Sequence, residues 1–142
     1  MRLSRILEET NISYSAVVLT PESHNKLKGE LTSQGYLTSD SMEGFELIAH
    51  HMTINMGSLK PDMKMRVGES VELEVVSFAE NDKVKAVGVD TPVETVNRQP
   101  HVTVAVNREK GGKPYLSNKL EKWEPIRKTF AITGIITEVP SK

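Results

Sequence analysis

The chain has 142 residues, of which 37% are hydrophobic and 26% are charged, and its formal net charge is −1. This length and composition are typical of one soluble domain with a buried core, so we expect a single domain over residues 1–142. The near-neutral charge argues against broad electrostatic binding to duplex DNA. The absence of cysteine excludes disulfides and thiolate zinc sites. Because neither a signal-peptide-like run nor a membrane-spanning stretch is present, we expect a cytoplasmic protein.

Hydrophobic spacing predicts several strands, one longer helix and little other regular structure. Thr20 and Pro21 suit the N-cap and first position of that helix, and Gly35 suits its end. The expected segments are a short helix or packing arm over 2–9, a strand over 14–19, a helix from Thr20 to Gly35, strands over 45–56, 71–78, 83–89, 101–107 and 130–139, an irregular stretch or short strand over 63–68, and a helical turn within 115–123. The segments over 71–78 and 83–89 read as an antiparallel hairpin. This pattern predicts an α+β fold of mainly antiparallel sheets that form a central cleft, with few helices.

Two of the predicted strands carry the same pattern of a His, an apolar residue, a Thr and an aliphatic residue. The two copies are His51-Met52-Thr53-Ile54 and His101-Val102-Thr103-Val104. Because side chains alternate along a strand, the His and Thr of each copy share one face. Thr is favoured in strands, so a single His-x-Thr pair on a solvated face usually carries no function. The chain has only four histidines, and two of them recur in register with a Thr, which indicates a site.

These paired motifs resemble the signature of the two-histidine phosphoesterase superfamily. That superfamily includes LigT-like RNA phosphodiesterases, cyclic phosphodiesterase domains of RNA-repair enzymes, and phage phosphodiesterases that destroy cyclic oligonucleotide signals. The order of strands and helix extends the resemblance from Tyr14 to about Val139. The resemblance implies a single two-histidine phosphoesterase-like domain, a hydrolase of phosphoric diesters, that needs no metal and no cofactor.

The chemistry of a phosphodiester explains why these residue types suit the reaction. One group must remove a proton from the attacking oxygen, and another must protonate the leaving oxygen. Histidine suits both roles because its unperturbed pKa of about 6.5 lies near neutral pH. The resemblance therefore makes His51 and His101 the acid–base pair, with Thr53 and Thr103 donating hydrogen bonds to the phosphoryl oxygens. The sequence does not assign which histidine is the base.

Four further residues are candidates for substrate binding. Lys113 and Tyr115 lie in the loop over 110–118, which either closes over a ligand or forms an ordinary exposed turn. Tyr14 and Trp123 either stack a nucleotide base or fill the core. The adjacent His50 and His51 face opposite sides of a strand and lack a carboxylate partner, so we expect no metal site.

The remaining polar candidates have simpler readings. His50 alternates onto the face of Met52, which favours a hydrogen-bonded histidine in the core or at an interface. His24 lies in the middle of the predicted helix, and we expect it on the surface. Asn55 and Asn107 share the faces of the two motifs, where each is either a site residue or a polar strand end.

We therefore expect a metal-independent phosphodiesterase acting on a small nucleotide or an RNA end. The expected bond is a 2′,3′-cyclic phosphate, a 2′,5′ linkage or a linkage within a cyclic oligonucleotide signal. The alternative is a non-catalytic module that uses the same pocket to bind a cyclic nucleotide or an RNA end, or an activity of the RNA-ligase type. A third interpretation is an interaction protein in which the His-x-Thr pairs are incidental.

Overall fold

The computed structural model describes residues 11–141, so the helix or arm expected over residues 2–9 lies outside the described residues. In chain order the elements are β1 (Ile12–Leu19), α2 (Pro21–Ser33), β2 (Glu46–Leu47), β3 (His51–Met56), α3 (Pro61–Lys64), β4 (Ser70–Glu80), β5 (Val84–Asp90), β6 (His101–Val106), the 3₁₀ turns η1 (Arg108–Lys110) and η2 (Pro114–Lys119), and β7 (Glu124–Pro140). The predicted hairpin is present as β4 and β5, and the helical turn expected within 115–123 is η2.

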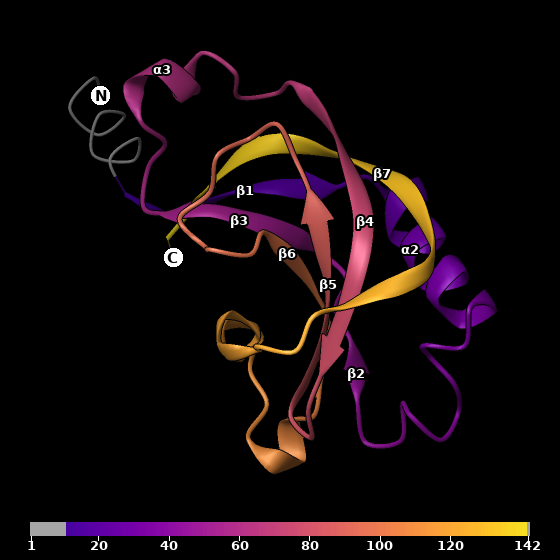
Figure 1. Ribbon diagram of the computed structural model, residues 1–142. Coiled ribbons are helices and arrows are strands. Elements are labelled where there is room, and N and C mark those ends of the chain that lie inside the picture. The colour runs from indigo at the N-terminus through magenta and orange to yellow at the C-terminus, as the bar shows by residue number, and fades with distance from the viewer. Residues whose placement is uncertain (1–10, 142) are drawn as a thin grey trace.

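The strands form one sheet that closes on itself. Their order is β2-β6-β3-β1-β7-β4-β5, every pairing is antiparallel, and β5 pairs back onto β6. Six strands therefore make a closed barrel, and the short β2 continues the line of β3 along the edge of β6. Figure 1 shows the long β7 arching across this sheet between β1 and β4. The predicted antiparallel α+β character is present, but in one closed sheet rather than in separate sheets around a cleft.

The core lies on one face of the strands and under α2. Alternation buries Met52 and Ile54 of β3 and Val102 and Val104 of β6 in the same apolar cluster as the two leucines of α2, Leu27 and Leu31. The helix begins where the sequence predicts, because the Thr20 hydroxyl accepts a hydrogen bond from the Ser23 amide and Pro21 stands at the first helical position. It ends before Gly35, whose φ of +87° suits a glycine.

The strand predicted over 45–56 is broken, and the break lies just before the first motif. Four residues lie between Leu47 and Met52, whereas two lie between their partners Ala105 and Val102 on β6. The motif strand therefore carries two extra residues, which form a bulge at Ala49 with a φ of +44°. Sequence periodicity could not reveal this break, because both halves are compatible with extended backbone.

Of the two forms expected over 63–68, the irregular one is present and the strand is not. The stretch holds the end of the short helix α3 (Pro61–Lys64), which was not predicted, followed by hydrogen-bonded turns. Pro61 favours this outcome because its fixed φ suits the first position of a helix. Within residues 11–141, no helix is long and apolar enough to cross a membrane.

Candidate active site

The two His-x-Thr motifs lie on neighbouring strands that pair directly. Met52 of β3 stands opposite Val102 of β6 in the antiparallel register. This register puts Thr53 across from His101 and makes His51 a diagonal neighbour of His101, roughly 7–8 Å away along the sheet. By alternation all of these side chains project from the face opposite Met52 and Val102. The expectation of two strands meeting across a cleft is therefore wrong in geometry, since the motifs share one sheet.

Both motifs line one cavity of about 450 Å³, which we call the first cavity. Its walls come from β1, β3, β6, the segment between β5 and β6, and η2. The lining residues are Tyr14, His51, Thr53, Met56, Val96, Asn97, His101, Thr103, Pro114, Tyr115 and Asn118. The structure thus gathers at one cavity the two histidines, the two threonines and both tyrosines that the sequence singled out. It does so from segments up to about one hundred residues apart.

His51 is held in its neutral form. Its Nδ1 lies 2.9 Å from Nδ1 of His50, so one of the two nitrogens donates and the other accepts. Burial, followed by the nearby His50 and His101, lowers the pKa of His51 to about 4. The Tyr14 ring packs against it with centroids 5.0 Å apart. At neutral pH His51 therefore has the protonation state of a general base.

His101 is oriented by a hydrogen bond at its Nδ1. Its Nδ1 lies 2.7 Å from the backbone oxygen of Gln99, and because a carbonyl only accepts, Nδ1 carries the hydrogen. Nε2 is then the nitrogen left to accept or deliver a proton. Burial lowers the pKa of His101, while hydrogen bonding to Gln99 and Asn118 acts in the opposite direction. The two histidines thus differ in their surroundings.

The two threonines have unequal surroundings. Thr53 is half-buried in the wall of the first cavity, across from His101. The Thr103 hydroxyl donates to the backbone oxygen of Pro114 at 3.2 Å and lies 2.9 Å from the buried hydroxyl of Ser117. A hydroxyl has one proton, so Ser117 donates to Thr103 when Thr103 donates to Pro114. Thr103 therefore also fastens η2 to β6.

Two other histidines lie at the bulge before β3. His24 of α2 donates from Nδ1 to the backbone oxygen of Ala49 at 2.9 Å, and His50 accepts through its backbone oxygen from the Leu19 amide. His24 is therefore half-buried and not a surface residue as expected. His50 is exposed and bonded to His51, rather than lying in the core, because the two extra residues of the bulge turn it out of the strand face.

The two asparagines near the motifs serve turns. Asn55 donates from Nδ2 to the backbone oxygens of Met56 and Ser58. Asn107 is buried, and its side-chain oxygen accepts from the Lys110 amide at the start of η1. Of the two readings left open by the sequence, the polar strand end applies to both.

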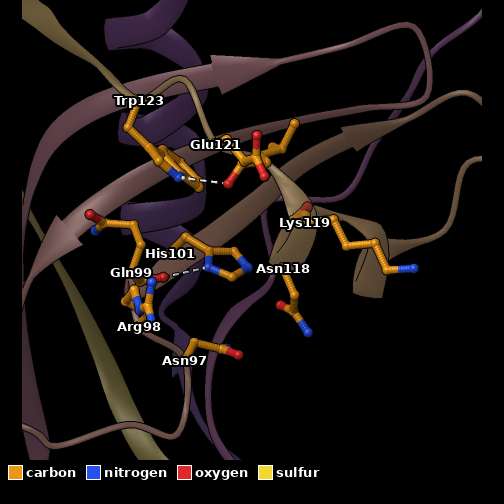
Figure 2. Close-up of a pocket in the computed structure, with 10 residues that line it drawn as sticks. Asn97, Arg98, Gln99, His101, Asn118, Lys119, Glu121 and Trp123 are labelled. Atoms are coloured by element: carbon orange, nitrogen blue, oxygen red, sulfur yellow. Dashed lines mark hydrogen bonds between the residues drawn. The ribbon is translucent and has the colours of Figure 1, made fainter.

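The two remaining sequence candidates, Trp123 and Lys113, lie in different surroundings. Trp123 lines a neighbouring cavity of about 770 Å³, the second cavity, and its ring centroid is 5.7 Å from that of His101. Lys113 is exposed and lines neither cavity, so its place in substrate binding stays a prediction. Figure 2 shows the second cavity with His101, Asn118 and Trp123 on its walls.

Sequence reasoning did not single out several polar side chains at these cavities, namely Asn97, Arg98, Gln99, Asn118, Lys119 and Glu121. They belong to the segment before β6, to the end of the 3₁₀ turn η2 and to the residues after it, where no long strand or helix period predicts which side chains face inward. The only available signal for Asn118 was its position in the loop that follows the second motif. Nothing in the sequence distinguishes Asn97 and Arg98 from an ordinary exposed turn.

Across residues 11–141, no group of three or more His, Asp or Glu side chains is arranged to hold a metal ion. The candidate donors at the site are therefore the two motif histidines, the neighbouring His50 and the hydroxyls of Thr53 and Thr103. Imidazole nitrogens can accept or deliver a proton and hydroxyls can donate hydrogen bonds, and these are the elements of general acid–base catalysis.

Comparison with known proteins gives a match in structure alone. No protein-family model matches the chain, and no curated protein sequence matches it. Among solved structures it is similar to the crystal structure of a fungal RNA kinase, with a TM-score of 0.55 and 12% sequence identity. The similarity covers 91% of this chain and 42% of that chain, so the chain spans less than half of that protein's length. At this identity the similarity shows a common fold.

Proposed function

We propose that the chain is a metal-independent phosphodiesterase of the two-histidine type that cleaves a nucleotide phosphodiester. The observation that carries this proposal is the convergence of His51, Thr53, His101 and Thr103 on the first cavity. A phosphate bound between the two diagonal imidazoles has a proton acceptor, His51, on one side and a proton donor, His101, on the other. The hydroxyls of Thr53 and Thr103 lie beside its oxygens. The expected bond remains a 2′,3′-cyclic phosphate, a 2′,5′ linkage or a linkage of a cyclic oligonucleotide.

The surroundings of the histidines assign their roles in this proposal. His51, with its pKa of about 4, is the base that takes a proton from the attacking oxygen. His101, whose hydrogen bonds to Gln99 and Asn118 favour the protonated ring, is the acid that protonates the leaving oxygen through Nε2. A new bond forms between phosphorus and the attacking oxygen, and the bond to the leaving oxygen breaks.

The threonine hydroxyls stabilise the phosphoryl oxygens. Thr53 donates from the strand position opposite His101. Thr103 turns its proton from the Pro114 oxygen to the substrate while Ser117 continues to donate to it. Hydrogen bonds that strengthen as charge is redistributed in the transition state lower the barrier.

RNA is the favoured class of substrate. The solved structure that the chain resembles is named as an RNA kinase, and its fold covers nearly all of this chain. The chain spans only 42% of that kinase, so phosphorylation is not part of the proposal.

The test is incubation with a panel of nucleoside 2′,3′-cyclic phosphates, 2′,5′- and 3′,5′-linked dinucleotides and cyclic dinucleotides, with products identified by mass spectrometry. His51→Ala and His101→Ala should each abolish nearly all turnover, and the double variant should be little worse because the pair acts as a unit. Lys26→Ala, an exposed change on α2, is the matched control. Activity should persist in EDTA. A wild-type protein that binds members of the panel without cleaving any would support the binding module instead.

A further inference from the structure

The second cavity adjoins the first and shares part of its wall. Asn97, His101 and Asn118 line both, so His101 stands between two spaces of about 450 and 770 Å³. Each volume lies in the range typical of small-molecule sites. A group cleaved beside His101 therefore has room on either side for a bulky substituent.

The second cavity has walls suited to a nucleoside. The indole of Trp123 is half-buried and lines the cavity, with the His101 ring 5.7 Å from it. Its Nε1 donates to the Leu120 oxygen at 3.1 Å, so a ligand meets the indole through its carbon atoms rather than through its N–H. Figure 2 shows the Trp123 ring directed toward the space beside His101, with Arg98 and Lys119 at the rim. Two cations and one carboxylate, Glu121, leave this rim with a net positive charge, which complements a phosphate chain.

The first cavity offers a comparable surface on the other side of His101. Tyr14 and Tyr115 lie on its walls with the apolar side chains of Met56 and Val96. Aromatic faces in each cavity match the requirement of a single-stranded nucleic acid, whose successive bases stack on such rings. A nucleoside 2′,3′-cyclic phosphate has one base and would leave one of the two cavities empty.

We propose that the two cavities bind the two nucleosides on either side of the scissile phosphate, with the base of one on Trp123. This inference rests on the proposed function, and it narrows the substrate to an oligonucleotide phosphodiester carrying a nucleoside on both sides. In a dinucleotide the leaving oxygen, protonated by His101, then belongs to the nucleoside in the second cavity. A 2′,3′-cyclic phosphate carries only the nucleoside of the other side, which lies in the first cavity, and its ring is opened with the two histidines in exchanged roles. The rim cations Arg98 and Lys119 meet the phosphates that continue beyond it.

The experiment compares two substrates, a dinucleoside monophosphate and a nucleoside 2′,3′-cyclic phosphate, in wild type, Trp123→Ala, Trp123→Phe and Tyr115→Ala. Trp123→Ala should lower kcat/KM for the dinucleotide about tenfold or more, in the range that one base–aromatic stack supplies, and the cyclic phosphate by less than about threefold. Trp123→Phe should restore most of the loss. Tyr115→Ala, which changes the first cavity, should reduce both activities alike. Equal losses on both substrates in Trp123→Ala would overturn the inference while leaving the phosphodiesterase proposal in place.

A binding measurement distinguishes failure of this inference from failure of the proposed function. Trp123 is the only tryptophan, so its fluorescence reports on the second cavity directly. In His51→Ala protein, a dinucleoside monophosphate should change the emission saturably, and a mononucleoside cyclic phosphate should change it little. This result supports the two-cavity assignment even if the wild type cleaves neither compound. An emission unchanged by the dinucleotide refutes the assignment.

Discussion

The pH dependence of kcat/KM tests the assignment of base and acid most directly. The productive free enzyme has His51 neutral and His101 protonated. With a pKa of about 4, His51 is protonated in only about one molecule in a thousand at pH 7. His101 also has a pKa below 6.5, so at pH 7 it has mostly lost the proton that the acid must deliver. We therefore expect kcat/KM to peak between about pH 4 and 6.5 and to fall toward tenfold per unit on either side.

Replacing His50 gives this prediction its control. After burial, His50 is the largest cause of the low pKa of His51, through repulsion between two like charges. His50→Ala should raise the pKa of His51 and move only the acid limb of the profile to higher pH. The alkaline limb, which belongs to His101, should stay in place. The assay is initial-rate kinetics at low substrate from pH 3.5 to 9 at constant ionic strength, with Lys26→Ala beside it. An optimum above pH 7, or an acid limb that does not move in His50→Ala, refutes the assignment.

Three other predictions follow from the same contacts. Thr53→Val and Thr103→Val should each lower kcat/KM about ten- to a hundredfold, since a hydrogen bond to a charged group contributes roughly 1.5–3 kcal/mol. Only Thr103→Val removes the hydrogen bonds that hold η2, so only this variant should also have a lower melting temperature. Equal melting curves for the two variants would contradict this. His24→Ala removes the hydrogen bond to the Ala49 oxygen, so we expect the free energy of unfolding, measured with urea, to fall by about 1 kcal/mol and kcat to fall several-fold. An unchanged kcat would show that His24 does not position the site. A histidine titrates near 6.5 in the unfolded chain and near 4 at His51 in the folded protein, so the unfolded state binds more protons between these values and stability falls as the pH drops through them. Urea midpoints at pH 7 and pH 5 should differ less in His51→Ala than in wild type, and an equal difference would contradict the lowered pKa.

The period of a strand allowed the sequence alone to put the His and Thr of each motif on one face, and these four side chains line the first cavity. A His and a Thr two positions apart share a face in any extended segment, whatever the strand later pairs with. The cap of α2 and the hairpin of β4 and β5 were also predictable, because both depend on residues close together in the chain. Tyr14 was named by the same reasoning, since it lies on a predicted strand. The direction of Lys113 could not be predicted, because a loop has no period that fixes where a side chain points, and in the structure it lines neither cavity.

The tertiary structure alone decided how the two motifs meet. Register between β3 and β6 depends on closure of a sheet whose strands lie fifty residues apart, and local pattern carries no information about it. The bulge at Ala49, which His24 contacts and after which His50 meets His51, exists only because β2 and β3 pair with β6 two residues out of step. The second cavity likewise arises from irregular segments that pack beside His101, and such packing is set by contacts between remote parts of the chain rather than by the residues within each segment.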